Sequence, residues 1–198
     1  MVFWKILLAS SGVNTIEAAG FLMERKEILR LAAKFDQQNA FWLSQEKEIG
    51  DRLRSTLELK KADLIKIIEW KFESDGRIRA AELRRASGIN EDFLVATSKS
   101  VFGIGIDRDL ERVEFLCCLR NGIGPSMASV ILAFFDPDNY GVLDFHVWEE
   151  LFNEKRRVLT SHDYVRLLSR LREDATRTGL QVRTVEKAYF MKSILGSQ

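Results

Sequence analysis

Residues 119–148 read LRNGIGPSMASVILAFFDPDNYGVLDFHVW, and they form the most informative segment of the chain. Gly122 and Gly124 permit backbone angles that other residues resist, and the missing side chains let backbone N–H groups approach an anion. Pro125 suits the first position of a helix, which we predict from Ser126 to Phe135. The free N–H groups and positive dipole end of this helix would face the same anion. The segment therefore indicates a turn that binds a nucleic-acid backbone without reading its sequence.

A plain structural interpretation competes with this one. A Gly-Ile-Gly-Pro turn also joins two packed helices without touching a ligand, and on its own that is the commoner meaning of such a motif. The residues that follow are more specific. A loop over residues 136–141 leads into Leu143-Asp144-Phe145-His146-Val147, and a helix is predicted from Phe145 to Phe152. Hairpin, helix, loop and Asp-x-His-Val occur in one order.

This arrangement resembles the helix-hairpin-helix DNA glycosylases of base excision repair, a superfamily that includes endonuclease III and the adenine glycosylase MutY. The family signature is a Gly-[Val/Ile]-Gly hairpin, a helix with a small residue in its second turn, a loop, and Val-Asp-Thr-His-[Val/Ile] with a catalytic aspartate. Here Gly122-Ile123-Gly124 matches the hairpin, Ala128 the small residue and Asp144 the aspartate. Gly124 and Asp144 are 20 residues apart, which is the family's characteristic separation. The resemblance covers about thirty residues.

Several positions depart from the family pattern. Arg120 stands where a leucine is usual, Phe145 replaces the threonine after the aspartate, and Glu149 replaces an arginine that contacts the DNA backbone. The iron–sulfur cysteines of endonuclease III and MutY are absent, because the chain has only Cys117 and Cys118, which are adjacent. The resemblance therefore points to a branch of the superfamily without an iron–sulfur cluster.

The resemblance implies a chemical role for Asp144. Removing a base breaks a glycosidic bond and leaves an oxocarbenium-like sugar cation. A nearby carboxylate either stabilises this cation or activates the water that attacks it. The base must first leave the stack, because its glycosidic bond is shielded in a duplex. The alternative role of Asp144 is an N-cap for the helix that starts at Phe145. Both roles can hold for the same carboxylate.

Ser126 bears on whether the DNA strand would also be cut. Family members that cleave the strand carry a lysine two residues after the second glycine, and its amine attacks the sugar to form a Schiff base. This chain has Ser126 at that position, as in members that only remove a base. We expect no other residue at the site to supply an amine, and we therefore predict an enzyme without lyase activity.

Further candidate residues surround these positions in the sequence. The expected contacts to the DNA backbone are Asn121, Gly122, Ile123, Gly124 and Ser126. The candidates for a base pocket are Phe145, His146, Trp148 and Trp70, with Trp42 a further aromatic that could stack on a base. Large helical aromatics are usually core residues, and a lone histidine is more often structural than catalytic. Phe145 and Trp148 are favoured because they flank Asp144.

Composition narrows the class of protein without naming a ligand. The net charge is +1, from 30 basic and 29 acidic residues, so charge alone does not indicate nucleic acid. No segment has the length of a membrane span, and the N-terminal apolar run is too short for a secretion signal. No metal-ligand spacing is present, so we expect no cofactor, although the resemblance leaves room for a monovalent cation at the hairpin carbonyls. We predict an intracellular protein, cytoplasmic or associated with the nucleoid.

Periodic apolar residues, few prolines and tight turns predict an all-α protein. The expected architecture is one helix-hairpin-helix domain over residues 1–198, with a middle lobe at about 60–150. Segments 1–59 and 151–198 would form the second lobe, with a cleft between the lobes and Asp144 at its mouth.

The pattern also places individual helix boundaries. The first long helix is predicted over Thr15–Ala33, followed by a polar break at Phe35–Asn39. Later on, Ser161 is the expected cap of a helix that Thr178-Gly179 closes.

The sequence thus predicts a monofunctional DNA glycosylase, a hydrolase of base excision repair that removes a damaged or mismatched base. Two alternatives stay open. One is a non-catalytic helix-hairpin-helix module that holds a DNA or RNA backbone, and the other is a purely structural helical protein. Whether Asp144 faces an open pocket or a packed core distinguishes the enzyme from the binding module.

Overall fold

The computed structural model describes residues 22–119 and 123–196, and within them every regular element is an α-helix. The prediction of an all-α protein is therefore confirmed. The helices of these residues are α1 (Arg25–Gln38), α2 (Ala40–Thr56), α3 (Lys61–Lys71), α4 (Gly76–Ser87), α5 (Glu91–Gly103), α6 (Asp109–Cys117), α7 (Pro125–Phe135), α8 (Phe145–Phe152), α9 (Ser161–Thr178) and α10 (Val182–Gly196). None of the described helices is both long and apolar enough to cross a membrane.

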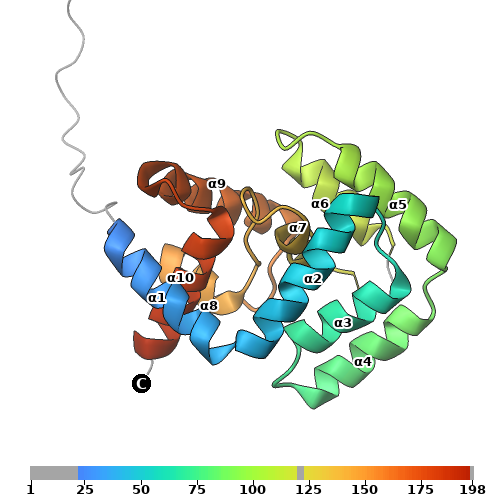
Figure 1. Cartoon of the computed structure of the whole chain (residues 1–198), viewed down its shortest axis with the longest axis horizontal. Helices are drawn as coiled ribbons and strands as arrows, with labels where there is room; N and C mark the ends of the chain where they lie inside the picture. The colour runs from blue at the N-terminus through green and yellow to red at the C-terminus, as the bar shows by residue number, and fades with distance from the viewer. Residues whose placement is uncertain (1–21, 120–122, 197–198) are drawn as a thin grey trace, which may run out of the picture.

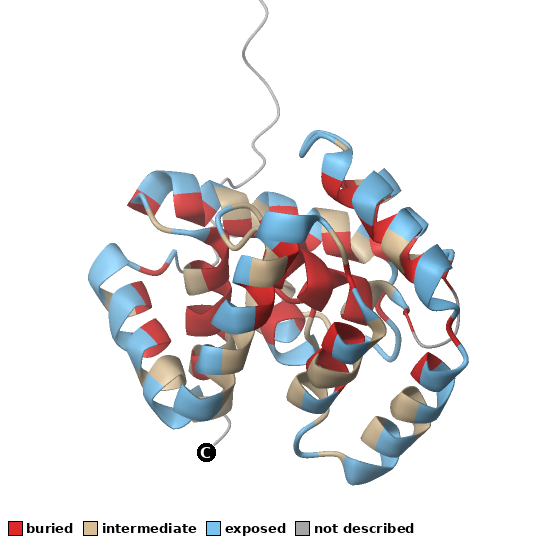
Figure 2. Ribbon diagram, turned by 45° about the vertical axis from the view of Figure 1, so that its right-hand side comes forward, coloured by how far each residue is buried: buried red, intermediate tan, exposed pale blue. Residues whose placement is uncertain are grey.

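Helix α7 lies at the centre of the molecule. Every residue from Met127 to Phe134 is buried. Figure 2 shows that buried residues are concentrated in the middle of the molecule. A helix that is apolar on all sides is stable only when other elements surround it. Here α2, α3, α6 and α9 all contact α7. The central helix of the quoted segment therefore organises the packing of the rest.

The other helices form two groups on either side of α7 (Figure 1). Helices α2 to α6 form one group, and α1, α8, α9 and α10 form the other, in which α10 packs along both α1 and α8. The boundaries differ from the lobes that we expected, because α2 joins the middle helices and α8 joins the terminal ones.

The position of α2 has a clear physical cause. A Cβ atom at Gly50 would overlap the carbonyl oxygen of Phe134, so glycine allows the two helix backbones to approach closely. Arg54 then donates hydrogen bonds to the carbonyls of Phe134 (2.9 Å) and Phe135 (3.0 Å) at the end of α7. These two hydrogen bonds satisfy carbonyl acceptors that the end of a helix leaves without a backbone partner.

Local capping signals set several helix starts. Asn90 caps α5 by accepting a hydrogen bond from the Phe93 N–H (2.9 Å). The predicted cap at Ser161 is wrong by one residue. Thr160 is the N-cap of α9, and its side chain and that of Asp163 bond reciprocally to each other's backbone N–H. Gly179 closes α9 in the left-handed region, at φ 65°, as predicted.

The first helix differs most from its prediction. Residues 22–24 are not helical, α1 begins at Arg25, and the expected break at Phe35–Asn39 is wrong because the helix continues through Gln38. Tertiary contacts hold this polar last turn. The ring of Phe35 packs edge-on against that of Phe190, with 5.7 Å between ring centroids, and Asp36 accepts a hydrogen bond from Lys187 (2.9 Å). The predicted part before residue 22 lies outside the described residues.

Candidate active site

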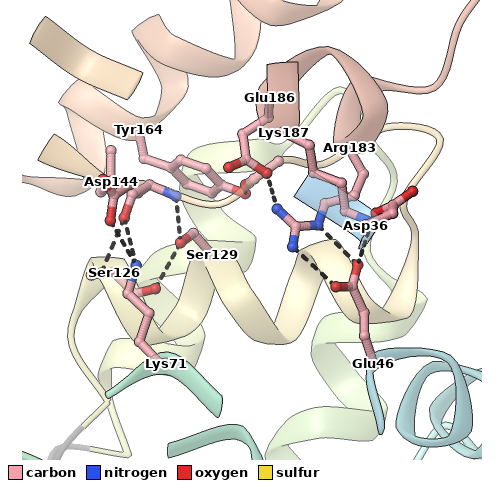
Figure 3. Close-up of polar contacts among 12 residues, drawn as sticks. Asp36, Glu46, Lys71, Ser126, Ser129, Asp144, Tyr164, Arg183, Glu186 and Lys187 are labelled. Atoms are coloured by element: carbon pink, nitrogen blue, oxygen red, sulfur yellow. Dashed lines mark hydrogen bonds and ion pairs between the residues drawn. The ribbon is translucent and has the colours of Figure 1, made fainter. Parts of the chain in front are cut away.

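Asp144 is the N-cap of α8, with extended backbone angles of φ −136° and ψ 147°. Its Oδ1 atom accepts a hydrogen bond from the His146 N–H (2.9 Å), so the capping role that we expected is present. Its Oδ2 atom lies 3.4 Å from Nζ of Lys71, at the end of α3 (Figure 3). The side chain is 24% exposed. One carboxylate oxygen is thus fixed by the backbone, and the other meets a cation.

Two serines of α7 hold the chain immediately before Asp144. The hydroxyl of Ser129 accepts a hydrogen bond from the buried Leu143 N–H (2.8 Å), and the Ser126 hydroxyl donates to the Leu143 carbonyl (3.1 Å). Lys71 Nζ lies 3.4 Å from the same carbonyl oxygen. The backbone of Leu143 is therefore fixed by side chains that come from two helices.

Gly141 fixes the same segment from the other side. Its carbonyl accepts a hydrogen bond from the buried Tyr164 hydroxyl (2.9 Å). A Cβ atom at this position would come within 2.9 Å of both Glu186 Cβ and Leu171 Cδ1. The segment therefore passes so close to α9 and α10 that a side chain would force the packing apart.

A pocket of about 410 Å³ opens beside Asp144, between α3 on one side and α8 and α10 on the other. This volume lies in the ordinary range for small-molecule sites. The residues that give the pocket its chemistry are Asp144, Lys71, His146, Trp70, Trp42 and Phe190. Aromatic rings, a carboxylate and an amine therefore line the same pocket.

The floor of the pocket carries buried charges. Arg183, 3% exposed, donates to both carboxylate oxygens of Glu46 (2.9 and 3.0 Å) and also pairs with Glu186. Burial opposes the positive charge of Arg183, but Glu186 and Glu46 outweigh it and raise the pKa of the guanidinium. Burial also disfavours the charged form of Glu186, and it raises the pKa of this carboxyl although the positive charge of Arg183 lowers it. Both Arg183 and Glu186 line the pocket, so a ligand would meet polar groups there.

The predicted aromatic residues divide between the pocket and other places. Trp70 lines the pocket, and its ring packs edge-on against Phe134, with centroids 5.1 Å apart. Trp148 is 0% exposed and lies under the side chains of Arg156 and Arg166, so the prediction that it contributes to a base pocket is wrong. It is a core residue because its position on α8 faces the other terminal helices. Phe145 is half exposed and is not among the residues that line this pocket.

His146 lies at the rim of the pocket. Its ring packs edge-on against Phe190, with 5.7 Å between centroids, and Nδ1 lies 3.5 Å from the Ser193 hydroxyl. These contacts join α8 to α10. The histidine therefore has packing partners as well as access to the pocket.

The hairpin is described only in part. Asn121 and Gly122 lie outside the described residues, whereas Ile123 is buried. Gly124 is the N-cap of α7 at φ −95° and ψ 179°, backbone angles that other residues also adopt. A Cβ atom on Gly124 would meet nothing within 4 Å. The backbone therefore does not require glycine here, and the open space beside it is available to a ligand.

Lys71 is the residue that sequence reasoning missed. The sequence drew attention to Ser126, at the family's lysine position, whereas the structure places Nζ of Lys71 3.4 Å from Asp144 Oδ2. Lys71 lies in the last turn of α3, where a cation is favoured by the helix dipole. Its presence in the sequence therefore does not by itself indicate a function. Lys71 precedes Asp144 by 73 residues, so no spacing connects them.

Among the described residues, no group of three or more histidine, cysteine, aspartate or glutamate side chains is placed to hold a metal ion. Comparison of the chain with protein-family models, with curated proteins and with solved structures finds no match.

Proposed function

We propose that this protein is a DNA glycosylase that removes a damaged or mismatched base from DNA. The observation that supports the proposal is the position of Asp144, whose carboxylate lies at the edge of an aromatic pocket instead of within a packed core. A non-catalytic binding module would need the cap but not the pocket. The resemblance of residues 119–148 to the helix-hairpin-helix glycosylases points to the same chemistry.

The pocket suits an extruded base. A flipped base is held by stacking between aromatic side chains and by hydrogen bonds to its edge. Trp70 and Trp42 offer aromatic surfaces, and Arg183 and Glu186 offer a donor and an acceptor at the floor. Arg183 and Glu186 are already buried and paired with each other. They could therefore form hydrogen bonds to the polar edge of a base without the cost of first removing water from the charged groups.

Asp144 would act on the sugar when the base leaves. Cleavage of the glycosidic bond moves electrons to the base and leaves positive charge on the sugar ring. The His146 N–H holds Oδ1 in place, so Oδ2 stays at the rim of the pocket without a further reorganisation. The carboxylate would stabilise the cation or take a proton from the attacking water.

The N-terminal end of α7 would bind the DNA backbone. Gly124 is exposed and leaves open space, and Pro125 begins the helix behind it. The free N–H groups of a helix start favour a phosphate. We expected Ser126 to contact the DNA backbone. Its hydroxyl bonds to the Leu143 carbonyl, so Ser126 would instead support the segment that precedes Asp144.

A panel of duplexes tests the proposal. Each duplex carries one damaged or mismatched base, and hot alkali after incubation reveals any abasic site as a strand break. We expect release of at least one class of base by the wild-type protein, with undamaged duplex and an Asp144→Asn variant as controls. If the panel binds but every base stays in place, the binding module is the better description.

A further inference from the structure

Helix α4 carries a local excess of positive charge. Its 12 residues include four arginines and one glutamate, whereas the whole chain has a net charge of only +1. The helix packs mainly on α3 and lies at the edge of the molecule (Figure 1). Most charged helix faces are merely solvated, so a further role has to be argued from the individual side chains.

The outer face of α4 consists of Arg77, Ala80, Ala81 and Arg84. The two arginines are separated by about two helical turns, so they lie on one face, about 10 Å apart along the helix axis. Both arginines are exposed. The carboxylate of the same helix, Glu82, has a side chain that is only 13% exposed. The outer face therefore presents two cations with small side chains between them.

The two arginines of this face differ from those of α9 in their ion pairs. Among the residues that the structure describes, no carboxylate lies within ion-pair distance of Arg77 or Arg84. In α9, by contrast, each of the four arginines pairs with a carboxylate. Carboxylates thus already compensate the positive charge of α9, whereas the outer face of α4 can attract an anion.

Helix stability does not explain the position of Arg77. The helix dipole favours a cation in the last turn, where Arg84 lies, but disfavours one in the first turn, where Arg77 lies. The N-cap, Asp75, accepts hydrogen bonds from the backbone N–H groups of Arg77 (3.1 Å) and Ile78 (2.9 Å) and forms no ion pair with the guanidinium. A cation at this unfavourable position indicates a role outside the helix itself.

The first turn of α4 adjoins the pocket beside Asp144. Glu73 and Ser74, in the turn that precedes α4, both line that pocket. At the other end of α4, the Ser87 carbonyl accepts a hydrogen bond from Lys61 (3.2 Å), at the start of α3. Helix α4 therefore runs back along α3 and away from the pocket, over a length of about 18 Å.

We propose that the outer face of α4 binds the phosphate backbone of the DNA that flanks the base in the pocket. This inference rests on the proposed function, which makes DNA the substrate. The phosphates of one strand follow each other at about 3.4 Å along the duplex axis, so the distance between Arg77 and Arg84 spans about three steps. A guanidinium group can donate two parallel hydrogen bonds to a phosphate, and the alanines let the strand approach the helix. DNA is favoured over an acidic protein because the face begins at the pocket.

The test measures binding of the full chain to an undamaged duplex over a series of salt concentrations, so that base release is not needed. The double variant Arg77→Gln with Arg84→Gln removes both charges and keeps good helix formers. We expect the slope of log affinity against log salt to become shallower by about two, and the affinity near 0.1 M salt to fall by about tenfold to a hundredfold. Arg77→Lys with Arg84→Lys keeps the charges and should retain most of the slope.

Arg30→Gln with Arg108→Gln is the matched control. These arginines are 59% and 55% exposed, and each pairs with a glutamate three residues away, so the control makes the same change in net charge at compensated sites. We expect it to bind DNA with the wild-type slope. Circular dichroism and thermal unfolding establish that every variant folds.

A wild-type slope in the folded Arg77→Gln and Arg84→Gln protein would overturn the inference. An equal loss in the control would overturn it too, because the effect would then follow net charge. Loss of binding to polyglutamate, with DNA binding unchanged, would identify an acidic protein as the partner instead. Base release by the wild type separates the two proposals. A shallower slope without base release would support the role of α4 and contradict the glycosylase, whereas base release with an unchanged slope would do the reverse.

Discussion

Two aspartates at helix starts, Asp109 in α6 and Asp144 before α8, have very different surroundings. Asp109 is 9% exposed, accepts a hydrogen bond from the Tyr140 hydroxyl (2.8 Å), and is paired with Arg172 through both of its carboxylate oxygens. Arg112 also donates to the Tyr140 hydroxyl (2.9 Å), so a buried network surrounds the carboxylate. Asp144 has one backbone hydrogen bond and one amine at 3.4 Å, beside an open pocket.

The difference separates a carboxylate with a structural role from the one that we propose to be reactive. The partners of Asp109 satisfy its acceptors and in turn depend on it. Burial, followed by the bond to Asp109, raises the pKa of the Tyr140 hydroxyl, which therefore stays protonated as a donor. Asp144 keeps an oxygen that can change partners when a substrate enters. A carboxylate with spare acceptor capacity at a pocket is the one to assign to chemistry.

Asp144→Asn should give the largest loss of activity. Asparagine keeps the size and can still accept the His146 N–H bond, but it removes the charge that would stabilise the sugar cation. We expect single-turnover base release to fall by about two to three orders of magnitude, with binding to the same lesion duplex nearly unchanged. A variant that folds and releases base at the wild-type rate would remove Asp144 from the mechanism.

Asp109→Asn is the matched change in the structural site, and it should act on stability. It leaves Arg172 without the negative charge with which it pairs, inside the buried network around Tyr140. We expect the free energy of unfolding to fall by about 2–4 kcal/mol, measured by urea denaturation, with the activity of the folded fraction retained. Stability equal to that of the wild type would show that the network around Asp109 does not stabilise the fold, and the contrast with Asp144 would then fail.

Ser129→Ala should affect both properties, because Ser129 supports the segment that carries Asp144. The change leaves the buried Leu143 N–H without its acceptor, at a cost of about 1–3 kcal/mol in unfolding free energy. Base release should also slow, since the position of Asp144 loosens. Ser126→Ala is the matched control, and it should cost less because Lys71 still lies near the Leu143 carbonyl. Equal effects from both serines would contradict this assignment.

Gly124→Glu and Gly124→Lys extend the contrast to the hairpin and should have the smallest effect on stability. Neither φ nor any neighbouring atom opposes a side chain at this position, so unfolding free energies should stay within about 0.5 kcal/mol of the wild type. Both variants should bind DNA more weakly, because the new side chain fills the space for a phosphate. The glutamate variant should lose about tenfold, or about 1.4 kcal/mol, since it also repels the backbone.

A salt series on two unrelated duplexes checks the hairpin prediction. Wild-type affinity should fall steeply with salt and be similar for both sequences, because phosphate contacts release counterions. Gly103→Glu is the control, since a Cβ atom at Gly103 also meets nothing within 4 Å but the glycine ends α5. Wild-type binding by a folded Gly124→Glu protein would exclude the hairpin as a DNA contact.

Local signals in the sequence predicted much of the fold. The cap at Asp144 and the closing Gly179 act on their own or neighbouring backbone groups, and the apolar run of α7 indicates a buried helix. Such signals work within one or two helical turns, so they can be read without knowing the rest of the structure. The end of α1 was missed because contacts with α10, far along the chain, hold its polar last turn.

The sequence by itself determined an all-helical chain, the central helix α7 and the cap at Asp144, because these follow from side-chain periodicity and hydrogen bonds between near neighbours. Only the tertiary structure decided that Trp148 is core, that Trp70 faces a pocket, and that Lys71 meets Asp144 across 73 residues. Those outcomes depend on how α3 packs against α7 and how α8 packs against α10. Packing of this kind minimises exposed apolar surface over the whole chain, and no short stretch of sequence contains that information.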